Sequence, residues 1–203
     1  REAIDKAVKH FTKNKGKGQR KMLWNCKMRF GKTLSALQVV REINAQRTLI
    51  VTHRPVVNAG WYEDFEKIFY DCGTTETKSP SATAVGSAKH DKQPARFNYG
   101  STTQGESLAQ LLRQAEKGMH IIGFVSMQDL RGSETVGGQH EKNDNVFATE
   151  WDLLIIDEAH EGTQTELGQN VIDALKHANT KVLQLSGTPF NLIDQYAEEE
   201  IFT

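Results

Sequence analysis

The sequence predicts an α/β fold, a three-layer sandwich in which helices cover both faces of a central, mainly parallel sheet. Short apolar segments alternate with longer segments of helical periodicity along the 203 residues. The apolar segments have the composition of strands that are buried on both faces, which is typical of parallel sheets. Ligands of such sheets bind at the carboxyl ends of the strands. We therefore expect functional residues where the strands end.

The elements follow in order from this alternation. The expected strands are 21–25, 48–52, 120–126, 153–157 and 181–186, and the expected helices are 3–11, 32–44, 56–69, 106–117 and 165–177. Two segments rich in small and polar residues, 71–105 and 131–149, interrupt the pattern and are expected to be long surface loops. Such loops are either functional or tolerated insertions. The chain opens inside an amphipathic helix, so we expect 1–203 to be one domain taken from a longer protein.

Charge is unevenly distributed, although the formal net charge is only −1. Residues 1–32 hold eleven Lys or Arg and two acidic residues, whereas the remainder holds 14 basic and 24 acidic residues. This basic segment is either a solvated loop or an edge that attracts phosphate. Cys26 and Cys72 lack the spacing of a zinc or iron–sulfur site. With only these two cysteines, a reducing, cytoplasmic setting is expected. No apolar run approaches the roughly 20 residues of a membrane helix, and the first residues are not a secretory signal.

A loop between the first strand and the second helix has the features of a phosphate-binding loop. Its residues are Cys26, Lys27, Met28, Arg29, Phe30, Gly31, Lys32 and Thr33. Successive backbone N–H groups of such a loop point at phosphates, and the helix N-terminus adds its positive end. Lys32 would reach the β- and γ-phosphates, and the Thr33 hydroxyl would bind Mg²⁺. Cys26 stands where the usual pattern has glycine, and Arg29 and Phe30 replace small residues, so this loop has a specialised shape.

The segment 151–160 carries the second half of the predicted site. Four consecutive aliphatic residues, 153–156, form a buried strand that ends in Asp157 and Glu158. Burying an unpaired carboxylate is costly, and a bound metal ion would offset that cost. Asp157 would hold Mg²⁺ through its water shell, and Glu158 would orient and deprotonate the attacking water. Such a pair can also simply cap a helix, but next to the phosphate loop it predicts one site for Mg-ATP.

A third strand ends in Ser186-Gly187-Thr188-Pro189-Phe190. Together with Gly31-Lys32-Thr33 and Asp157-Glu158-Ala159-His160, this segment resembles motifs I, II and III of superfamily-two helicases and translocases. The sequence is most similar to the helicase-type motor domain of restriction enzymes, and the resemblance covers essentially the whole chain. It implies a RecA-like P-loop NTPase fold, ATP and Mg²⁺ as cofactors, and a second motor domain outside this chain.

The resemblance also implies residue roles. Lys32, Asp157 and Glu158 would be catalytic, and Thr33 and Asp157 would bind Mg²⁺. The coupling residues between hydrolysis and domain movement would be His160, Ser186 and Thr188. The segment 49–55 is similar to motif Ia, which touches the nucleic-acid backbone, and 126–128 resembles another element that contacts a nucleic-acid strand. The nucleic-acid-binding residues would be Thr52, His53, Arg54, Ser126 and Gln128, through phosphate contacts that do not read sequence. His53 and Arg54 are equally compatible with an ordinary solvated loop.

The leading interpretation is the ATP-hydrolysing motor domain of a DNA-dependent helicase or translocase from a restriction system. Its expected partners are double-stranded DNA, a second RecA-like domain and restriction–modification subunits. No association with a membrane is expected. The alternatives are a DEAH-type RNA helicase, a small-molecule P-loop phosphotransferase and a nucleotide-gated binding module. Glu158 argues against the last, because a binding module needs no water-activating carboxylate. Gln19 lies near the phosphate loop, but by resemblance to the restriction-type motors the adenine-reading glutamine would precede residue 1. The arginine fingers of the second domain are absent, so weak ATPase activity is expected from this chain alone.

Overall fold

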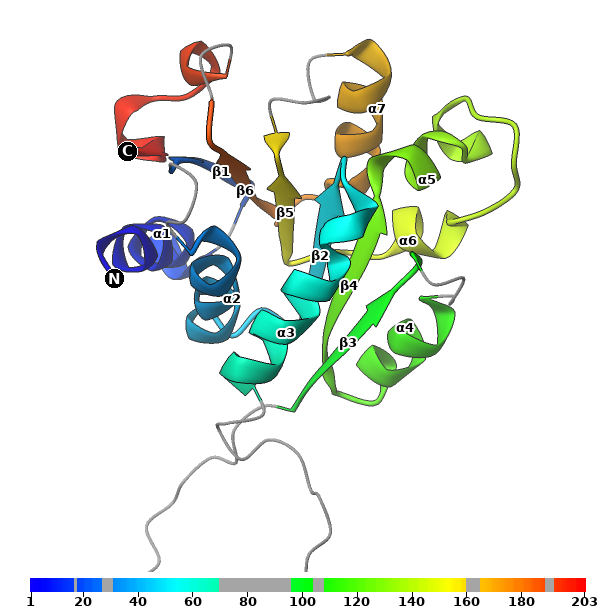
Figure 1. Cartoon of the computed structure of the whole chain (residues 1–203), viewed down its shortest axis with the longest axis horizontal. Coiled ribbons are helices and arrows are strands. Elements are labelled where there is room, and N and C mark those ends of the chain that lie inside the picture. Colours follow the sequence, from blue (N-terminus) through cyan, green and yellow to red (C-terminus); the bar gives the residue numbers. More distant parts are fainter. Residues whose placement is uncertain (17, 27–30, 70–95, 104–107, 160–164, 189–191) are drawn as a thin grey trace, which may run out of the picture.

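The computed structural model describes residues 1–16, 18–26, 31–69, 96–103, 108–159, 165–188 and 192–203. Seven strands of these residues form one sheet, in the order β3-β4-β2-β5-β6-β1-β7 (Figure 1). They are β1 Arg20–Asn25, β2 Arg47–Thr52, β3 Phe97–Ser101, β4 His120–Ser126, β5 Leu153–Asp157, β6 Lys181–Ser186 and β7 Ile201–Phe202. Every pair of neighbouring strands is parallel. The predicted parallel α/β sheet is therefore confirmed.

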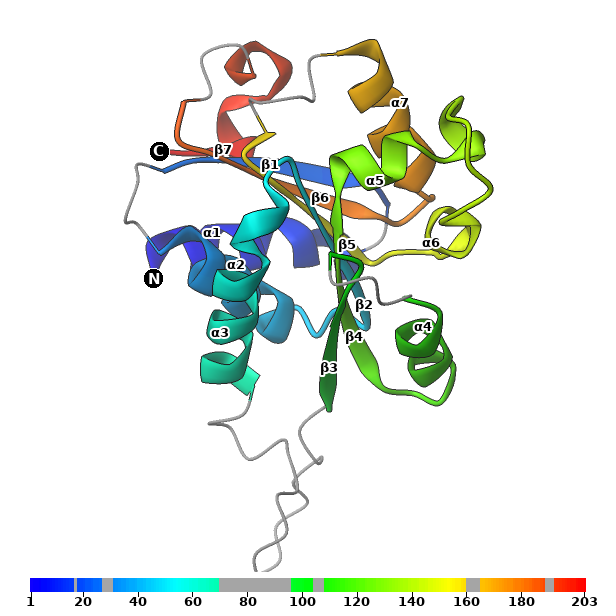
Figure 2. The same cartoon turned by 45° about the vertical axis from the view of Figure 1, so that its right-hand side comes forward.

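Helices cover both faces of this sheet (Figure 2). The α-helices are α1 Glu2–Thr12, α2 Lys32–Glu42, α3 Asn58–Phe69, α4 Ala109–Glu116, α5 Met127–Arg131, α6 Asp144–Ala148 and α7 Glu166–Leu175. The 3-10 helices are η1 Lys13–Gly16, η2 Pro55–Val57, η3 Glu134–Val136, η5 Ile193–Gln195 and η6 Glu198–Glu200. α1, α2 and α3 lie on one face, and α4, α5, α6 and α7 lie on the other. The sheet and its two helical layers make the predicted three-layer sandwich.

Two apolar clusters, one on each face, hold the layers together. Successive side chains of a strand point to opposite faces, so Ile155 of β5 packs toward α1–α3 and Leu154 packs toward α4–α7. The same alternation places Leu183 and Val182 of β6 on opposite faces. Because both faces are covered, consecutive residues in the middle of β2 (49–51) and of β5 (153–156) are apolar and buried. This is why they read as continuous apolar segments in the sequence.

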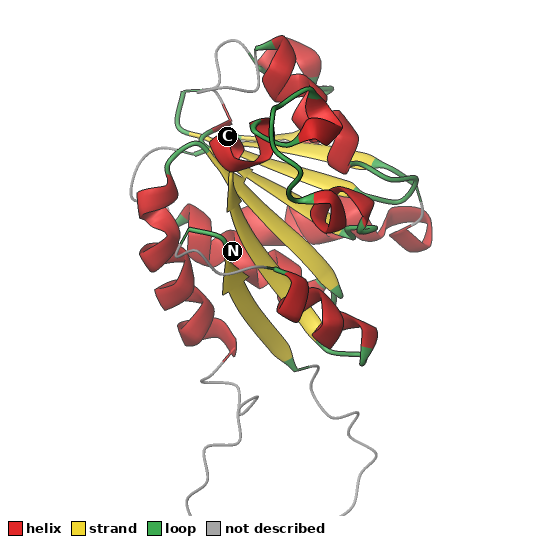
Figure 3. Ribbon diagram, turned by 90° about the vertical axis from the view of Figure 1, so that its right-hand side faces the viewer, coloured by secondary structure: helices red, strands yellow, loops and turns green. Residues whose placement is uncertain are grey.

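The strand register brings four predicted site residues to one edge of the sheet. Thr52, the last residue of β2, lies opposite Ser126 of β4 on one side and Asp157 of β5 on the other. Asn25, at the end of β1, lies opposite Ser186 of β6. The carboxyl ends of these strands therefore meet along one edge, between the two helical layers (Figure 3).

The five predicted strands and five predicted helices are all present, with ends shifted by a few residues. Two expectations about loops were wrong in part. The segment 71–105 contains the edge strand β3, although its residues 71–95 lie outside the described residues. The segment 131–149 contains η3 and α6, and the α6 side chains Val146 and Phe147 are buried in the core. β3 and α6 have five residues each, and neither contains a run of four apolar residues, such as 153–156 of β5, that would reveal so short an element.

Candidate nucleotide and magnesium site

The phosphate loop begins at Cys26, directly after β1. The backbone N–H of Cys26 donates to the carbonyl of Ser186 at 3.1 Å, which ties the loop to the end of β6. The Cys26 side chain is buried, and burial raises the pKa of its thiol to about 11, against an opposing effect of Lys32. The predicted phosphate-binding residues Lys27, Met28, Arg29 and Phe30 lie outside the described residues.

Gly31 forms the turn from this loop into α2. Its φ of 77° is in the left-handed region, which glycine enters without steric cost. Its carbonyl accepts the Ser35 N–H at 2.9 Å, the first hydrogen bond of the helix. Lys32 and Thr33 therefore occupy the first turn of α2, where unpaired backbone N–H groups and the helix dipole favour an anion.

Lys32 and Glu158 come together although they are far apart in the sequence. Lys32 Nζ lies 3.5 Å from Glu158 Oε1, and the two side chains are 13% and 27% exposed. Glu158 has a φ of 50°, in the left-handed region, which costs a residue with a Cβ about 1–2 kcal/mol. Strained backbone of this kind is concentrated at functional sites. Here it turns the chain sharply where β5 ends and places the carboxylate beside the lysine.

Asp157 is 6% exposed, and both of its carboxylate oxygens accept hydrogen bonds. The indole Nε1 of Trp61, on α3, donates to Oδ2 at 3.1 Å, and the backbone N–H of Glu158 donates to Oδ1 at 3.0 Å. Burial raises the pKa of Asp157, and the neighbouring charge of Glu158 raises it further, whereas Trp61 and Lys32 lower it. The carboxylate is thus held in a fixed orientation in a poorly hydrated position.

The Thr33 hydroxyl donates to Asp64 Oδ2 at 2.5 Å. Asp64 also lies on α3, and its other oxygen is 3.3 Å from Lys67 Nζ. Neither Trp61 nor Asp64 was predicted from the sequence. Only Asp64 has a signal in the sequence, because it borders the helical face on which Trp61 and Phe65 are buried. An acidic residue at the border of a buried helical face calls for a partner.

The oxygen donors of this site fit Mg²⁺. The described residues contain no group of three or more His, Cys, Asp or Glu side chains able to hold a metal ion by themselves. Mg²⁺ does not need such a group, because it usually binds one or two protein oxygens together with substrate phosphates and waters. The Thr33 hydroxyl and the Asp157 carboxylate are oxygen donors of that kind. Each is hydrogen-bonded to a residue of α3, Thr33 to Asp64 and Asp157 to Trp61.

The third predicted motif adjoins the same loop. Ser186 is fully buried, and its Oγ accepts the backbone N–H of Thr188 at 3.2 Å. Thr188 is exposed at the edge of the sheet. A Cβ built on Gly187 would lie 3.8 Å from Lys32 Nζ, so this turn passes close to the lysine. His160, the third predicted coupling residue, lies outside the described residues.

The predicted nucleic-acid contacts divide into two groups. The buried hydroxyls Thr52 and Ser126 bond to the backbone: Thr52 accepts the N–H of Arg54 at 3.0 Å, and Ser126 caps α5 by accepting the N–H of Asp129 at 3.1 Å. Arg54 and Gln128 are exposed at the same edge, and His53 is half-buried. The hydroxyls shape the loops, whereas Arg54 and Gln128 are the side chains of this set that face solvent.

Fold and motifs together define the class of protein, a RecA-like ATPase core of the superfamily-two helicase type. The structure is similar to the SWI2/SNF2 ATPase core of Sulfolobus solfataricus in complex with double-stranded DNA, with a TM-score of 0.56, 17% sequence identity, and coverage of 98% of this chain and 33% of that one. It is also similar to the UvsW helicase of bacteriophage T4, with a TM-score of 0.51, 15% sequence identity, and coverage of 90% of this chain and 54% of that one. The chain thus spans a third to a half of these proteins.

Residues 1–191 match the family described as type III restriction enzyme, res subunit, and the chain belongs to that family. No curated protein matches the sequence. Within the described residues, no helix combines the length and the apolar character that crossing a membrane requires.

Proposed function

We propose that this chain is the ATP-binding and ATP-hydrolysing motor domain of a DNA-dependent helicase or translocase of the restriction type. One observation carries the proposal: the phosphate-loop lysine and the strand-end glutamate lie within 3.5 Å of each other at the carboxyl edge of the sheet. Glu158 would then lie beside the γ-phosphate that Lys32 would bind. A water-activating carboxylate at that position supports hydrolysis rather than binding alone.

The ion pair between Lys32 and Glu158 suggests how the site would respond to nucleotide. Without a phosphate nearby, the two charges neutralise each other. A γ-phosphate would take the lysine as its partner, and Glu158 would then accept a proton from the attacking water. Thr33 and Asp157 would hold Mg²⁺, which neutralises the charge that develops on the phosphates. The buried setting of Asp157 keeps its carboxylate fixed without reorganisation.

Movement on nucleic acid would involve the same edge. Arg54 and Gln128 are exposed there and would contact a phosphate backbone. Ser186, Thr188 and His160 would couple hydrolysis to a second RecA-like domain. Double-stranded DNA as the substrate is supported by the DNA in the similar SWI2/SNF2 core, and an association with restriction–modification subunits by the family description. A cytoplasmic location fits these partners.

A comparison of nucleic acids as ATPase stimulators tests the proposal. On the full-length protein, duplex DNA should stimulate hydrolysis, and Arg54→Ala should reduce that stimulation. Arg113→Ala, an exposed arginine on α4, should not. Stimulation by single-stranded RNA alone would instead favour the DEAH-type RNA helicase, for which Asp157-Glu158-Ala159-His160 is the supporting observation. Transfer of the phosphate to a small molecule, with no release of inorganic phosphate, would favour a phosphotransferase.

A further inference from the structure

Helix α3 contacts both protein groups proposed to bind the metal. Its Trp61 donates to Asp157, and its Asp64 accepts from Thr33. Residues three apart on a helix lie on the same side, so one side of α3 meets the end of β5 and the start of α2 together. We propose that Trp61 and Asp64 are positioning residues of the magnesium site, acting through Asp157 and Thr33. This inference rests on the proposed function and assigns two residues to it.

Asp64 determines where the Thr33 proton points. A threonine hydroxyl has one proton and two acceptor lone pairs, and it rotates to suit its partners. Donation to Asp64 Oδ2 at 2.5 Å uses the proton. Both lone pairs of Oγ1 then face away from Asp64 and are available to a cation. Asp64 is close enough to fix the hydroxyl, and its side chain is 18% exposed, so most of it is shielded from competing water.

Trp61 acts on the other oxygen donor. The indole N–H is only a donor, and Trp61 is fully buried, so its N–H has no water to bond instead of Asp157. Together with the Glu158 N–H on Oδ1, it fixes the plane of the carboxylate from both sides. Each oxygen keeps a further lone pair for the water shell of a metal ion. Loss of the indole donor would leave Oδ2 buried with one partner fewer.

Partners of this kind have large effects on metal sites. Removing a group that orients a metal ligand typically lowers metal affinity or activity about 10–100-fold, even though the ligand itself remains. The quantity that reports it here is the magnesium enhancement of ATP binding, defined as the Kd for ATP in EDTA divided by the Kd in saturating Mg²⁺. If α3 had a purely structural role, the substitutions would raise both Kd values by the same factor and leave this ratio unchanged.

The test is a calorimetric titration of ATP into the wild-type chain, Asp64→Asn and Trp61→Phe, with Mg²⁺ or with EDTA. Each variant should reduce the enhancement about tenfold and leave the Kd in EDTA unchanged. Asp64→Asn keeps the shape of the side chain, removes its negative charge and replaces one acceptor oxygen by an NH2 group. Trp61→Phe keeps an aromatic ring and removes the N–H. Near-UV circular dichroism checks that each variant is folded, and Asp64→Asn decides the question if Trp61→Phe is not.

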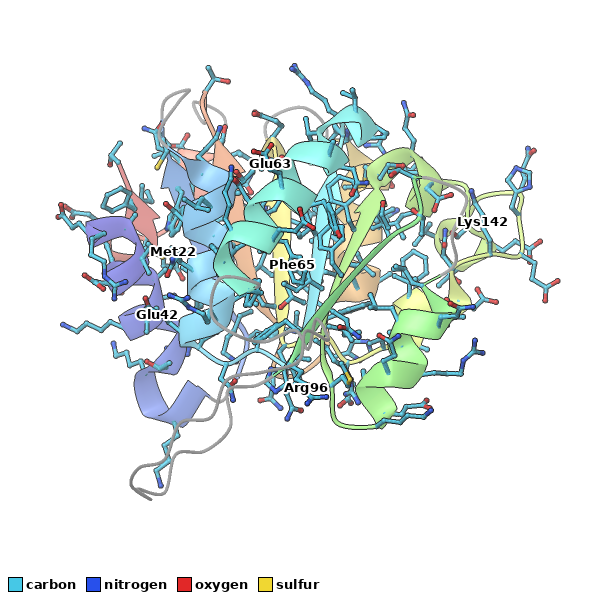
Figure 4. All side chains as sticks on the ribbon, turned by 60° about the horizontal axis from the view of Figure 1, so that its bottom comes forward. Met22, Glu42, Glu63, Phe65, Arg96 and Lys142 are labelled. Carbon is cyan, nitrogen blue, oxygen red and sulfur yellow. The ribbon has the colours of Figure 1, made fainter. Side chains whose placement is uncertain are left out.

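Glu63→Gln is the matched control. Glu63 neighbours Asp64 on α3, but it points to solvent with a side chain that is 68% exposed, whereas Phe65 points into the core (Figure 4). The control should show the wild-type enhancement. An unchanged enhancement in Asp64→Asn would overturn the inference, and so would an increased one, because Asp64 would then compete with the metal for Thr33. If wild-type ATP binding shows no magnesium enhancement at all, the proposed ATP site itself fails.

Discussion

Replacement of Lys32 by alanine should abolish ATP binding at ordinary nucleotide concentrations. Lys32 stands in the first turn of α2 with a side chain that is only 13% exposed, so its ammonium group would meet the phosphates in a poorly hydrated position. A hydrogen bond to a charged group contributes about 1.5–3 kcal/mol. Since each 1.4 kcal/mol is a factor of about ten, one such bond corresponds to a loss of about 10–150-fold in affinity. A second contact, to another phosphate, would multiply that loss.

The fold should tolerate this change. Alanine at Lys32 removes the ion pair with Glu158, but Glu158 is 27% exposed and can be hydrated, so the free energy of unfolding should change by at most about 1 kcal/mol. Calorimetric titration with ATP in saturating Mg²⁺ measures the affinity, and thermal unfolding of the same samples measures stability. Lys117→Ala, which removes an exposed lysine beside α4, is the matched control. Equal ATP affinity in Lys32→Ala and wild type would refute the assignment of the phosphate loop.

Further predictions concern catalysis, reactivity and stability. Glu158→Gln should bind ATP normally and lose turnover, and hydrolysis at the wild-type rate would place the base elsewhere. Cys26, whose pKa is raised to about 11, should react with iodoacetamide much more slowly at pH 7 in the folded chain than in urea, as mass spectrometry of its peptide can show; equal rates would contradict its burial. Burial lowers the pKa of His120, so its contribution to stability is complete above about pH 6.5 and is lost as the pH falls. The melting temperature of His120→Phe should therefore fall less between pH 7 and pH 5 than that of wild type, and parallel curves would be the opposing result. Leu183→Ala, in the core beneath α1–α3, should cost about 2–5 kcal/mol in urea unfolding, and a cost below about 1 kcal/mol would mean that this core is loosely packed.

The fold could be predicted because its buried strands and periodic helices leave strong local signals. Leu153 to Ile156 can hardly be anything but a covered strand, and the alternation with helices leads directly to a parallel sheet. The edge strand β3 was missed for a physical reason. Of its two buried positions, Phe97 is apolar and Ser101 is polar, and the half-buried residues between them include only one aromatic residue, Tyr99. An edge strand needs fewer apolar residues because it has a neighbour on one side only.

The candidate site was predictable where it lies at strand ends and not where it lies on a helix. The sequence predicted that Lys32 and Glu158 share one site, and the structure brings them together. Trp61 and Asp64 were missed because their partners, Asp157 and Thr33, come from other elements. Nothing local distinguishes Trp61 from an ordinary core tryptophan. The Trp61 N–H acquires its partner only because α3 packs against the end of β5 and the start of α2.

The gathering of these groups along one edge of the sheet leaves the opposite edge available for handling the molecule. The loops that precede β2, β4 and β6 lie at the amino ends of the strands, and Lys117, in the loop before β4, is exposed there. A cysteine introduced at that position could carry a fluorophore or a surface tether while the carboxyl edge, with the candidate nucleotide site, stays unobstructed. The buried thiol of Cys26 would not compete for a maleimide at neutral pH, so replacing Cys72 would leave a single labelling position. Such an attachment would let single molecules be observed with the proposed ATP-binding edge turned toward the solution.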